Sequence, residues 1–482
     1  MDMLSHLGVF EGQTDVGSVL LRGATQYFRS DQSFILEGSG SSTSNPTAGF
    51  HFTWKLVGGD FILYSSAEFL QQGADSYGTV GILVRKNLTP ESPYFYIALH
   101  GDALVAMQYR NASGTISEKI QTSTQGASIL QIERKCNTLL ASSCIFGDPL
   151  QCMGSLDIDW NTDALYVGLF VSAHHANRME RAKFTNVRLI FPAPNTFIPY
   201  SDYLGSNVEL LDIETGHRQL VYNSDENLEA PNWHPDGFLI LNGSGRLYRI
   251  TIGECVAQLI QSDFANRNNN DHGISPDGRY LAISHHATNR PDGLNSLIYI
   301  MPIKGGKPVL VTPNGPSYWH GWSPNGSRLI YTGMRNGNYN IYSISVDGGD
   351  ELQLTHSEGL SDGSDFSPCG GFIWFNSNRS GSMQIWRMRS DGSEQTQITN
   401  DQNQNWFPHP SPDGKWVIFL SYPPEVGPWE HPYYKHVMLR LMSTDDAKPK
   451  VVAHLYGGQG TINVPSWCRN SRMVAFVSNS GK

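Results

Sequence analysis

The stretch HGISPDGRYLAIS, residues 272–284, decides the fold because close variants of it recur through the second half of the chain. Each variant reads as a strand, a tight turn of the Pro-Asp-Gly type and a second strand rich in β-branched and aromatic residues. Such a unit needs neighbours of its own kind to bury its apolar faces. The variants are PNWHPDG (231–237), HGWSPNGSRLIYTG (320–333), SDFSPCGGFIWFNS (364–377), PHPSPDGKWVIFLS (408–421) and PSWCRNSRMVAFVS (465–478).

The spacing of these phrases predicts a repeated four-stranded unit. The prolines at 235, 276, 324, 368 and 412 are 41, 48, 44 and 44 residues apart, and Arg469 takes the sixth place after 57 residues. A period in this range is typical of β-propeller blades. The sixth unit ends after its second strand, while residues 207–223 (NVELLDIETGHRQLVYN) supply an unmatched outer pair. We therefore expect a six-bladed propeller over residues 207–482, closed by strands from both ends of the domain so that no sheet edge stays open.

Residues 1–193 show a different pattern. Segments such as FHFTWKLVGGDFILYSSAEFL (50–70) alternate apolar and polar residues between Gly, Asn and Asp breaks. This alternation is typical of a two-sheet β-sandwich. The run VGLFVSAH followed by AKFTNVRL resembles the concanavalin-like jelly rolls found beside carbohydrate enzymes. With residues 194–206 as the expected linker, the whole chain is predicted to be all-β.

Composition narrows the range of partners. The 482 residues carry a formal net charge of -10 without a basic stripe, which argues against nucleic acid. No run reaches the ~18 apolar residues of a membrane span, and the start lacks the basic and apolar regions of a signal peptide. We therefore expect a cytoplasmic protein that acts on small-molecule substrates, away from membranes. The six cysteines show no CxxC spacing and are expected to be free thiols.

The recurring SPDG phrase, followed by alternating apolar residues, resembles the TolB-like, PD40 class of six-bladed propellers over roughly residues 200–482. The resemblance implies the fold but no function, because propellers host many unrelated activities. The turns within each unit are stereotyped Asx and Gly turns. By contrast, the connections that enter each unit and those after its second strand are irregular, and we expect them to meet at one mouth that carries the function.

The predicted mouth is rich in side chains that bind or activate a ligand. His272 and His320 stand four residues before the turn proline of adjacent units, where the first, fifth and sixth units have proline. Arg379 follows the second strand of its unit in an R-x-G sequence. These three are the candidate catalytic residues. The candidate substrate-binding residues are Asn270, Asp271, His285, His286, Trp319, Arg335, Asp362, Asp365, Trp406, His409, Tyr422, Trp429 and Tyr433.

Structural roles compete with these assignments. Arg335 and Arg379 could pair with carboxylates between blades, and Trp319 and Trp406 could wedge neighbouring blades. A metal site could draw on His272, His285, His286, His320 and His409, since imidazole suits zinc, manganese or iron. Their spacing includes no HxH or HExxH motif, so neither a metal nor another cofactor is expected. A carboxylate pair of a glycosidase could come from Asp362, Asp365, Glu425 or Glu430, although nothing in the sequence marks two of them as partners.

In its build, a signal-less jelly roll followed by a six-bladed propeller, the chain is similar to the fungal intermolecular hetero-Diels–Alderases of tropolone sesquiterpenoid pathways. The resemblance implies a cofactor-free cyclase of secondary metabolism that joins a tropolone quinone methide to a humulene-type sesquiterpene. The candidate catalytic residues would polarise the dienone oxygen, and Trp319, Trp406, Tyr422 and Trp429 would shape an apolar chamber. The alternatives are a carbohydrate-active hydrolase or lyase, favoured by the jelly roll and by the Asn, Trp and His at the mouth, and a non-catalytic TolB-like binding scaffold.

Overall fold

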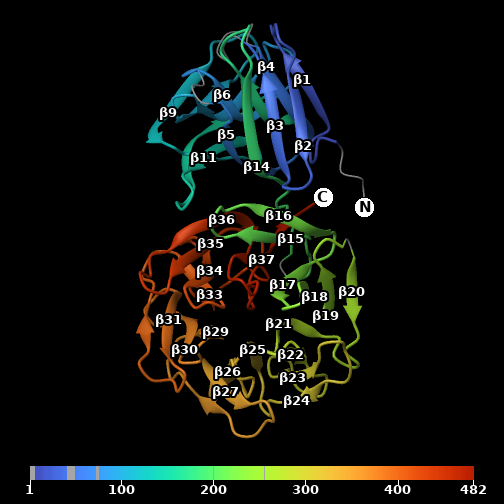
Figure 1. Ribbon diagram of the computed structural model, residues 1–482, viewed down its shortest axis with the longest axis vertical. Coiled ribbons are helices and arrows are strands. Elements are labelled where there is room, and N and C mark those ends of the chain that lie inside the picture. The colour runs from blue at the N-terminus through green and yellow to red at the C-terminus, as the bar shows by residue number, and fades with distance from the viewer. Residues whose placement is uncertain (1–5, 41–48, 72–74, 199, 255) are drawn as a thin grey trace. The chain divides into compact units, whose positions relative to one another are not determined.

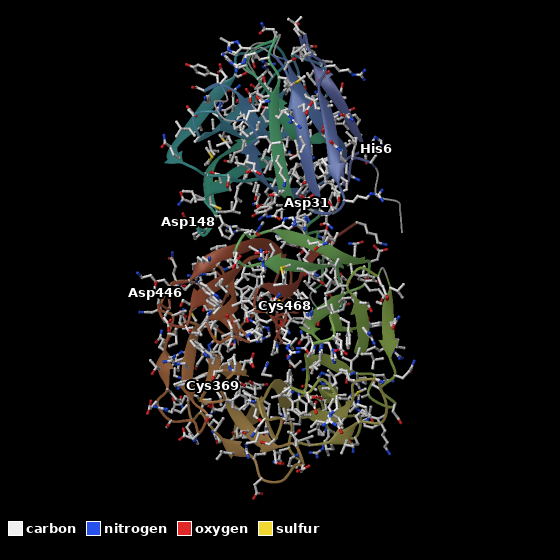
Figure 2. All side chains as sticks on the ribbon, in the orientation of Figure 1. His6, Asp31, Asp148, Cys369, Asp446 and Cys468 are labelled. Carbon is white, nitrogen blue, oxygen red and sulfur yellow. The ribbon has the colours of Figure 1, made fainter. Side chains whose placement is uncertain are left out.

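The computed structural model describes residues 6–40, 49–71, 75–198, 200–254 and 256–482, and its regular elements are all β-strands (Figure 1). The chain divides into two compact units, residues 1–194 and 195–482. The described ranges contain no helix, and so none that is long and apolar enough to cross a membrane. The all-β prediction is confirmed, and Figure 2 shows the side chains that fill the two units.

The N-terminal unit consists of two seven-stranded antiparallel sheets whose facing sides form one core. Phe34 and Leu63 from one sheet pack in the same cluster as Ile82 and Phe95 from the other. The first sheet runs β1 (Gly12–Val16), β4 (Phe50–Gly58), β13 (Ala164–Ser172), β6 (Thr79–Arg85), β7 (Tyr94–His100), β8 (Leu104–Arg110) and β9 (Glu118–Gln125). The second runs β12 (Gln151–Asp157), β11 (Thr138–Cys144), β10 (Ile129–Lys135), β5 (Phe61–Phe69), β14 (Glu180–Ile190), β3 (Ser33–Gly38) and β2 (Ala24–Phe28).

The central strands β6 and β7 of the first sheet are buried on both faces. Because side chains alternate along a strand, the neighbours of the core residues turn to the opposite face. There Leu83, Tyr94, Tyr96 and Phe170 form a second apolar cluster, and each is at most 3 % exposed. This second cluster is rich in aromatic side chains.

The C-terminal unit is a ring of six sheets, five of them with four strands (Figure 1). The three-stranded sheet joins β16 (Arg218–Ser224) and β15 (Gly205–Asp212) to β37 (Met473–Ser480). An isolated bridge between Trp467 and Val474 stands where the other sheets have their first strand. The four-stranded sheets are β17 (Leu228–Trp233), β18 (Phe238–Gly243), β19 (Arg246–Thr251) and β20 (Ala257–Ile260); β21 (Asn268–Ile274), β22 (Tyr280–His286), β23 (Ser296–Pro302) and β24 (Val309–Leu310); β25 (Ser317–Trp322), β26 (Arg328–Arg335), β27 (Asn338–Ser345) and β28 (Leu352–Gln353); β29 (Ser361–Phe366), β30 (Phe372–Ser377), β31 (Gln384–Arg389) and β32 (Thr396–Gln397); and β33 (Gln404–Pro410), β34 (Trp416–Tyr422), β35 (Lys435–Ser443) and β36 (Lys450–Gly457).

The repeated SPDG phrase owes its form to hydrogen bonds within the first turn of each blade. Ser275 Oγ donates to Asp277 Oδ1 over 2.6 Å and accepts a hydrogen bond from the Tyr280 backbone nitrogen at 2.9 Å. Gly278 completes the turn with φ of 72°, a conformation that favours glycine. The same serine–aspartate bond recurs at Ser411 in the fifth four-stranded sheet. The motif is therefore a local fold signal, as the sequence predicts.

Close packing between blades explains the glycine that precedes this motif. A Cβ atom on Gly273 would lie 1.7 Å from the ring of Trp319, which belongs to the next blade and is 1 % exposed. Trp322 Nε1 donates to the Gly273 carbonyl oxygen over 2.9 Å. The first strands of successive four-stranded sheets contact one another. Trp319 therefore packs between neighbouring blades, which is the structural role that the sequence suggests as an alternative.

The described cysteines, Cys136, Cys144, Cys152, Cys369 and Cys468, are free thiols, as predicted. Figure 2 labels Cys369 and Cys468 in the propeller. Cys255 lies outside the described residues.

Candidate functional site

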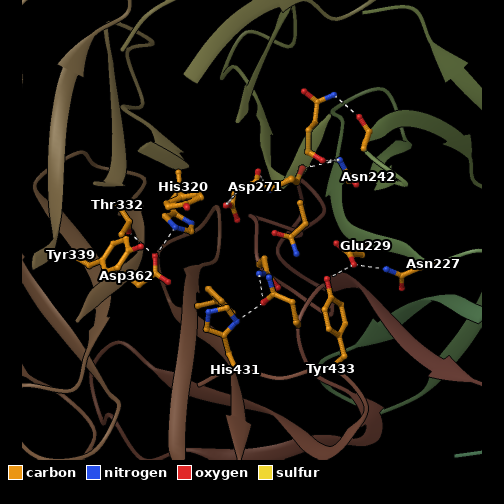
Figure 3. A pocket seen from close by; sticks show the side chains of 18 of the residues that line it. Asn227, Glu229, Asn242, Asp271, His320, Thr332, Tyr339, Asp362, His431 and Tyr433 are labelled. Carbon is orange, nitrogen blue, oxygen red and sulfur yellow. Dashed lines mark hydrogen bonds and ion pairs between the residues drawn. The ribbon is translucent and has the colours of Figure 1, made fainter. Parts of the chain in front are cut away.

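A cavity of about 630 Å³ opens at one mouth of the propeller (Figure 3). It takes residues from the five four-stranded sheets, from the segment before β15 and from the segment between β36 and β37. We call it the mouth cavity. Its lining residues are Tyr203, Asn227, Glu229, Asn242, Ser244, Gly245, Asn268, Asn269, Asn270, Asp271, Tyr318, His320, Thr332, Tyr339, Leu360, Asp362, Phe407, Trp429, His431, Tyr433, Gln459 and Asn463.

A break in strand pairing places the polar residues of the inner strands at this cavity. The first strand of every four-stranded sheet shifts its register against the second strand, as a β-bulge does. Ala230, Gly363 and Phe407 lie in three of the shifted segments with φ of 54°, 58° and 54°, in the left-handed region. Non-glycine residues rarely adopt this conformation, and it concentrates at functional sites. The shift turns side chains of an otherwise buried strand toward the axis.

The bulge explains why His272 and His320, which occupy matching positions in the repeat, differ in whether they line the mouth cavity. In β25 the shift lies between Trp319 and Gly321, so His320 is the extra residue. In β21 it lies between Asn268 and His272, and His272 already pairs in register with Ile283. His320 therefore lines the mouth cavity, whereas in the preceding blade Asp271 does so.

His320 and Asp362 form an ion pair between adjacent blades. His320 Nε2 lies 2.8 Å from Asp362 Oδ1, and the same oxygen accepts a hydrogen bond from Thr332 Oγ1 at 2.6 Å. Burial alone would lower the pKa of His320, but the charge of Asp362 outweighs it, and the pKa is raised. Burial would raise the pKa of Asp362, and the charge of His320 instead holds it well below its usual range. Asp362 is therefore ionised at neutral pH, and its charge favours the protonated form of His320. Neither ring nitrogen of His320 makes a hydrogen bond of good geometry with a described residue, so its contact with Asp362 is an ion pair.

Asp271, from the neighbouring blade, lines the cavity close to His320 (Figure 3). Asn269 Nδ2 donates to Asp271 Oδ2 over 2.8 Å. Burial, helped by the negative charge of Asp362, raises the pKa of Asp271 to about 7, although the charge of His320 opposes the shift. One wall thus holds an ionised carboxylate, while another holds a carboxyl group that is close to half protonated at neutral pH.

A third carboxyl group belongs to Glu229, which is 7 % exposed. Tyr433 donates its hydroxyl proton to Glu229 Oε1 over 2.8 Å, and the Asn227 amide also donates to this oxygen. Burial raises the pKa of Glu229, while these hydrogen bonds counteract it. Tyr203, from the segment before β15, packs its ring 6.0 Å from that of Tyr433.

The remaining wall is formed by amides, an imidazole and an exposed indole. His431 Nδ1 lies 2.5 Å from Gln459 Oε1, and Asn463 Nδ2 donates to the same oxygen over 3.1 Å. Trp429 is 60 % exposed and offers an open aromatic face. None of the lining residues is a lysine or an arginine. The cavity can therefore accept and donate many hydrogen bonds, and its fixed charge is mostly negative.

Six of the residues predicted from the sequence line the mouth cavity. They come from four different blades, and the ring closure brings them together. They are Asn270, Asp271, His320, Asp362, Trp429 and Tyr433.

Two of the three predicted catalytic residues lie elsewhere. His272 is fully buried, with Nδ1 3.0 Å from the Asn270 carbonyl oxygen and Nε2 3.3 Å from that of Ile240. Arg379 bonds to Ser377 and Ser361 and lies over the Trp386 ring at 4.9 Å. Both side chains serve packing in or between blades, and neither lines the mouth cavity.

The other predicted binding residues also have structural partners. Arg335 pairs with Glu351 of its own blade, so its partner is not the neighbouring blade. Asp365 and His409 bond to each other at 3.1 Å below the cavity. Trp319 and Trp406 are at most 1 % exposed. His285 contacts the rings of Phe264 and Tyr299, and His286 approaches Asn295. Tyr422 donates to the Pro432 carbonyl oxygen.

Several residues that line the mouth cavity were not predicted from the sequence, and Tyr318 is one of them. Tyr318 and His320 point to the cavity, whereas Trp319 between them points into the blade interface, because strand residues alternate. The irregular connections expected to enter the blades are largely inner strands themselves. Glu229 stands two residues before Pro231. It could have been predicted as a lining residue because it is an acidic residue within an apolar strand. Tyr339, Gln459 and Asn463 carry no such signal.

No group of three or more His, Cys, Asp or Glu side chains within the described part of the chain is arranged to hold a metal ion. Of the candidate metal ligands named from the sequence, His272, His285 and His286 belong to one blade, and His320 and His409 belong to two others.

Comparisons with known proteins agree with this architecture. Residues 274–482 match the PD40 family, TolB beta propeller domain. An uncharacterized protein of Agrobacterium fabrum is 45% identical over 274 residues, which cover 56% of this chain and 92% of that protein. A solved TolB-like protein of Agrobacterium tumefaciens is 44% identical with a TM-score of 0.55, covering 58% of this chain and 99% of that one. The fold and site define a β-propeller with a ligand-sized mouth cavity, and the chain belongs to the TolB-like, PD40 propeller family.

Proposed function

We propose that the propeller is a binding protein for a neutral or cationic polyhydroxylated ligand, such as a sugar or an amino sugar. The observation that carries this proposal is the lining of the mouth cavity, which combines carboxylates, amides and tyrosine hydroxyls without lysine or arginine. Its volume of about 630 Å³ lies within the ~300–1,000 Å³ of typical ligand sites. This is a refined form of the binding-scaffold alternative, and the family relationship is compatible with it.

The donors and acceptors suit a ligand with many hydroxyl groups. Each hydroxyl both donates and accepts, so it can bond to the carboxylate of Asp362 and to the amides of Asn269 or Gln459 at once. The exposed face of Trp429 can cover an apolar ring face. Such a ligand satisfies polar atoms that would otherwise depend on water.

The charge of the cavity selects against acidic ligands. Glu229, Asp271 and Asp362 bring three carboxyl groups, against the single positive charge of His320. A phosphate or a uronate would have no guanidinium or ammonium partner and would face at least one ionised carboxylate. Like charges in a partly desolvated site repel strongly, whereas an ammonium group would be attracted.

Hydrolysis of a bound glycoside is a second candidate, favoured by the different protonation of two carboxyl groups. Asp271, with its pKa raised to about 7, could protonate a leaving oxygen while Asp362 remains an anion. Pairs whose environments push their pKa values apart are typical of acid–base catalysis. The Asp271→Asn variant should then lose turnover by at least ~10²-fold while ligand affinity changes little. If oligosaccharides that bind are never cleaved, this candidate fails and the binding function stands.

The expected cyclase gains no support from the geometry. An apolar chamber is needed for a humulene-type alkene, and the walls here are rich in Asn, Asp and Tyr. Of the three residues expected to polarise its partner, only His320 reaches the cavity. We therefore do not retain the cyclase as the proposal. The cytoplasmic location stays a prediction.

Calorimetric titration of the purified chain with neutral, amino-substituted and acidic oligosaccharides tests the proposal. We expect neutral or amino sugars to bind, acidic ones not to bind, and Trp429→Ala to weaken binding about tenfold or more. Trp386→Ala is unsuitable as a control because that ring supports Arg379. Tyr280→Ala is a better one, because Tyr280 is 43 % exposed and lines no part of the mouth cavity. Preferential binding of acidic sugars, or binding indifferent to Trp429→Ala, would refute the proposal.

A further inference from the structure

Two arginines of the N-terminal unit are buried side by side without a carboxylate partner among the residues that the structure describes. Arg85 ends β6 and is 2 % exposed, and Arg110 ends β8 and is 1 % exposed. Tyr94 on β7 pairs in register with both of them. The three side chains therefore stand in one row across three neighbouring strands, on the aromatic face of the sheet.

The row places one ring between two guanidinium groups. The Arg85 guanidinium carbon lies 5.9 Å from the centre of the Tyr94 ring, and that of Arg110 lies 5.1 Å from it. Phe50 lies 5.2 Å from the Arg85 guanidinium carbon. These contacts offset part of the cost of burial, but they neutralise neither charge.

The other partners of the pair are neutral. Arg85 Nε donates to the Asn87 carbonyl oxygen over 3.1 Å, and its Nη2 donates to that of Thr89. Arg110 Nη1 donates to the Pro90 carbonyl oxygen over 3.0 Å. Arg110 Nε and Nη2 are buried and have no hydrogen-bond partner among the described residues. The loop that contains Asn87, Thr89 and Pro90 thus covers the row with backbone carbonyl oxygens. Two nitrogen donors of Arg110 remain without an acceptor among the described residues.

No ion pair with a described residue balances this charge. Burial and, to a smaller extent, Arg110 lower the pKa of Arg85 to about 10, so Arg85 stays charged at neutral pH. Glu91 is exposed, and its negative charge has only the weakest influence on the pKa of Arg85. Two buried like charges of this kind are costly unless a counter-charge joins them.

A small cavity lies at the centre of this cluster. It measures about 10 Å³ and is bounded by the two arginines, Pro90 and a set of apolar and aromatic side chains, namely Phe50, Leu83, Tyr94, Tyr96 and Phe170. Space of this size holds about one water-sized occupant. The edges of aromatic rings carry partial positive charge and so favour an anion. A carboxylate or phosphate group, with three or more heavy atoms, exceeds the space.

From these observations we propose that the cavity between Arg85 and Arg110 binds one monatomic anion, chloride under ordinary conditions, as a structural counter-ion of the N-terminal unit. The anion neutralises the guanidinium pair and supplies the acceptor that Arg110 lacks. This site is independent of the mouth cavity and of the ligand proposed for it.

Thermal unfolding of the full chain in sodium chloride and in sodium gluconate at equal ionic strength tests the proposal, because gluconate is too large for the cavity. An anion that binds only the folded state stabilises it by mass action. We expect the unfolding transition of the N-terminal unit to lie about 3 to 5 °C higher in chloride once chloride exceeds its dissociation constant tenfold. Equal melting temperatures in the two salts would overturn the proposal.

Two matched variants locate the effect. Arg110→Met should abolish the difference between the salts and lower the stability less in gluconate than in chloride, since it removes an uncompensated charge. Arg134→Met is the control, because Arg134 is also buried, at 6 %, and its donors also bond to backbone carbonyls, those of Cys136 and Asp163. It should keep the full chloride dependence. The opposite pattern would refute the site.

Should Arg110→Met fail to fold, crystals of the wild-type chain grown or soaked in sodium bromide decide the question. Bromide replaces chloride and scatters anomalously, so a peak between the two guanidinium groups is expected. A cavity filled by density without an anomalous signal would mean that water occupies it, and the proposal would be wrong.

Discussion

His320 Nε2 lies 2.8 Å from Asp362 Oδ1, and this pair joins the third and fourth blades at the wall of the mouth cavity. His320 is 3 % and Asp362 13 % exposed at the side chain, so water screens their attraction little. The pair is thus both a link between blades and the most polarised feature of the cavity. It leads to the first two predictions.

Removal of the carboxylate in Asp362→Asn should destabilise the protein by about 3 kcal/mol near pH 6.5, because a buried charge loses its partner. Denaturant unfolding of the wild type and the variant measures the difference. Thr332→Val, which removes only the hydroxyl bonded to Asp362, serves as the comparison and should cost about 1 kcal/mol. Equal effects of the two variants would show that the charge of the pair does not matter.

The same pair should give the protein a stability window in pH. The pKa of His320 is raised, so its contribution is complete below the pKa of an unfolded histidine and is lost as the pH rises through the folded value. The pKa of Asp362 is lowered, so its contribution is present above about 4 and is lost as the pH falls further. Unfolding free energies between pH 3 and pH 9 should fall at both ends. The Asp362→Asn variant should lose much of this dependence.

Asp271 should have the opposite effect on stability. The pKa of Asp271 is raised to about 7 in the folded protein. Between about pH 4 and pH 7 this carboxyl group is ionised in the unfolded chain but still protonated in the folded protein. The folded protein therefore becomes less stable as the pH rises through this range. Asp271→Asn should therefore stabilise the protein at pH 8, by up to about 4 kcal/mol, and change it little at pH 4. Chemical unfolding at the two pH values checks this. A variant that is less stable than the wild type at pH 8 would contradict it.

Binding of a cationic ligand should follow the ionisation of Asp271. Affinity for an amino sugar is expected to rise severalfold between pH 6 and pH 8, as long as its amine stays protonated, because a negative charge appears in the cavity. Calorimetric titration should show a flat profile for Asp271→Asn. A neutral sugar is the internal control, and a pH dependence equal to that of the amino sugar would assign the effect to another group.

Tyr433 and Tyr434 are adjacent in sequence, and exchanging each for phenylalanine separates binding from stability. Tyr433 donates to buried Glu229, whereas Tyr434 accepts from the Leu204 backbone nitrogen at 3.0 Å and does not line the mouth cavity. Each change should cost about 1 kcal/mol of stability. Only Tyr433→Phe should weaken ligand binding. Thermal unfolding and titration of both variants measure these effects.

Gly273→Ala should disrupt the contact between the second and third blades. Its Cβ would lie 1.7 Å from the Trp319 ring, so the cost should reach about 3 kcal/mol or more. Gly371→Ala is the control, since its Cβ would meet only Cys369 Sγ at 3.5 Å, an ordinary contact. Comparable stability of the two variants would show that the blades adjust freely.

How much of the site could be predicted depended on the strand register. The sequence indicated the mouth and six of its residues, because irregular segments at regular spacing must converge in a ring. It did not separate His272 from His320, since both stand four residues before a turn proline. The bulges lie at different places in β21 and β25, and this displacement decides which side chain turns to the axis. No local motif marks it.

The blade repeat and its turns follow from local sequence, because the Ser-Pro-Asp-Gly bonds form within a few residues of one another. The all-β character is likewise local, since it follows from the alternation of residues along each strand. Which polar groups meet depends instead on how the strands and blades pack. His320 faces Asp362 because two blades pack together, and Arg85 stands beside Arg110 because Tyr94 pairs with both across a sheet. Such contacts join residues far apart in the chain, and their energies depend on burial that exists only after folding.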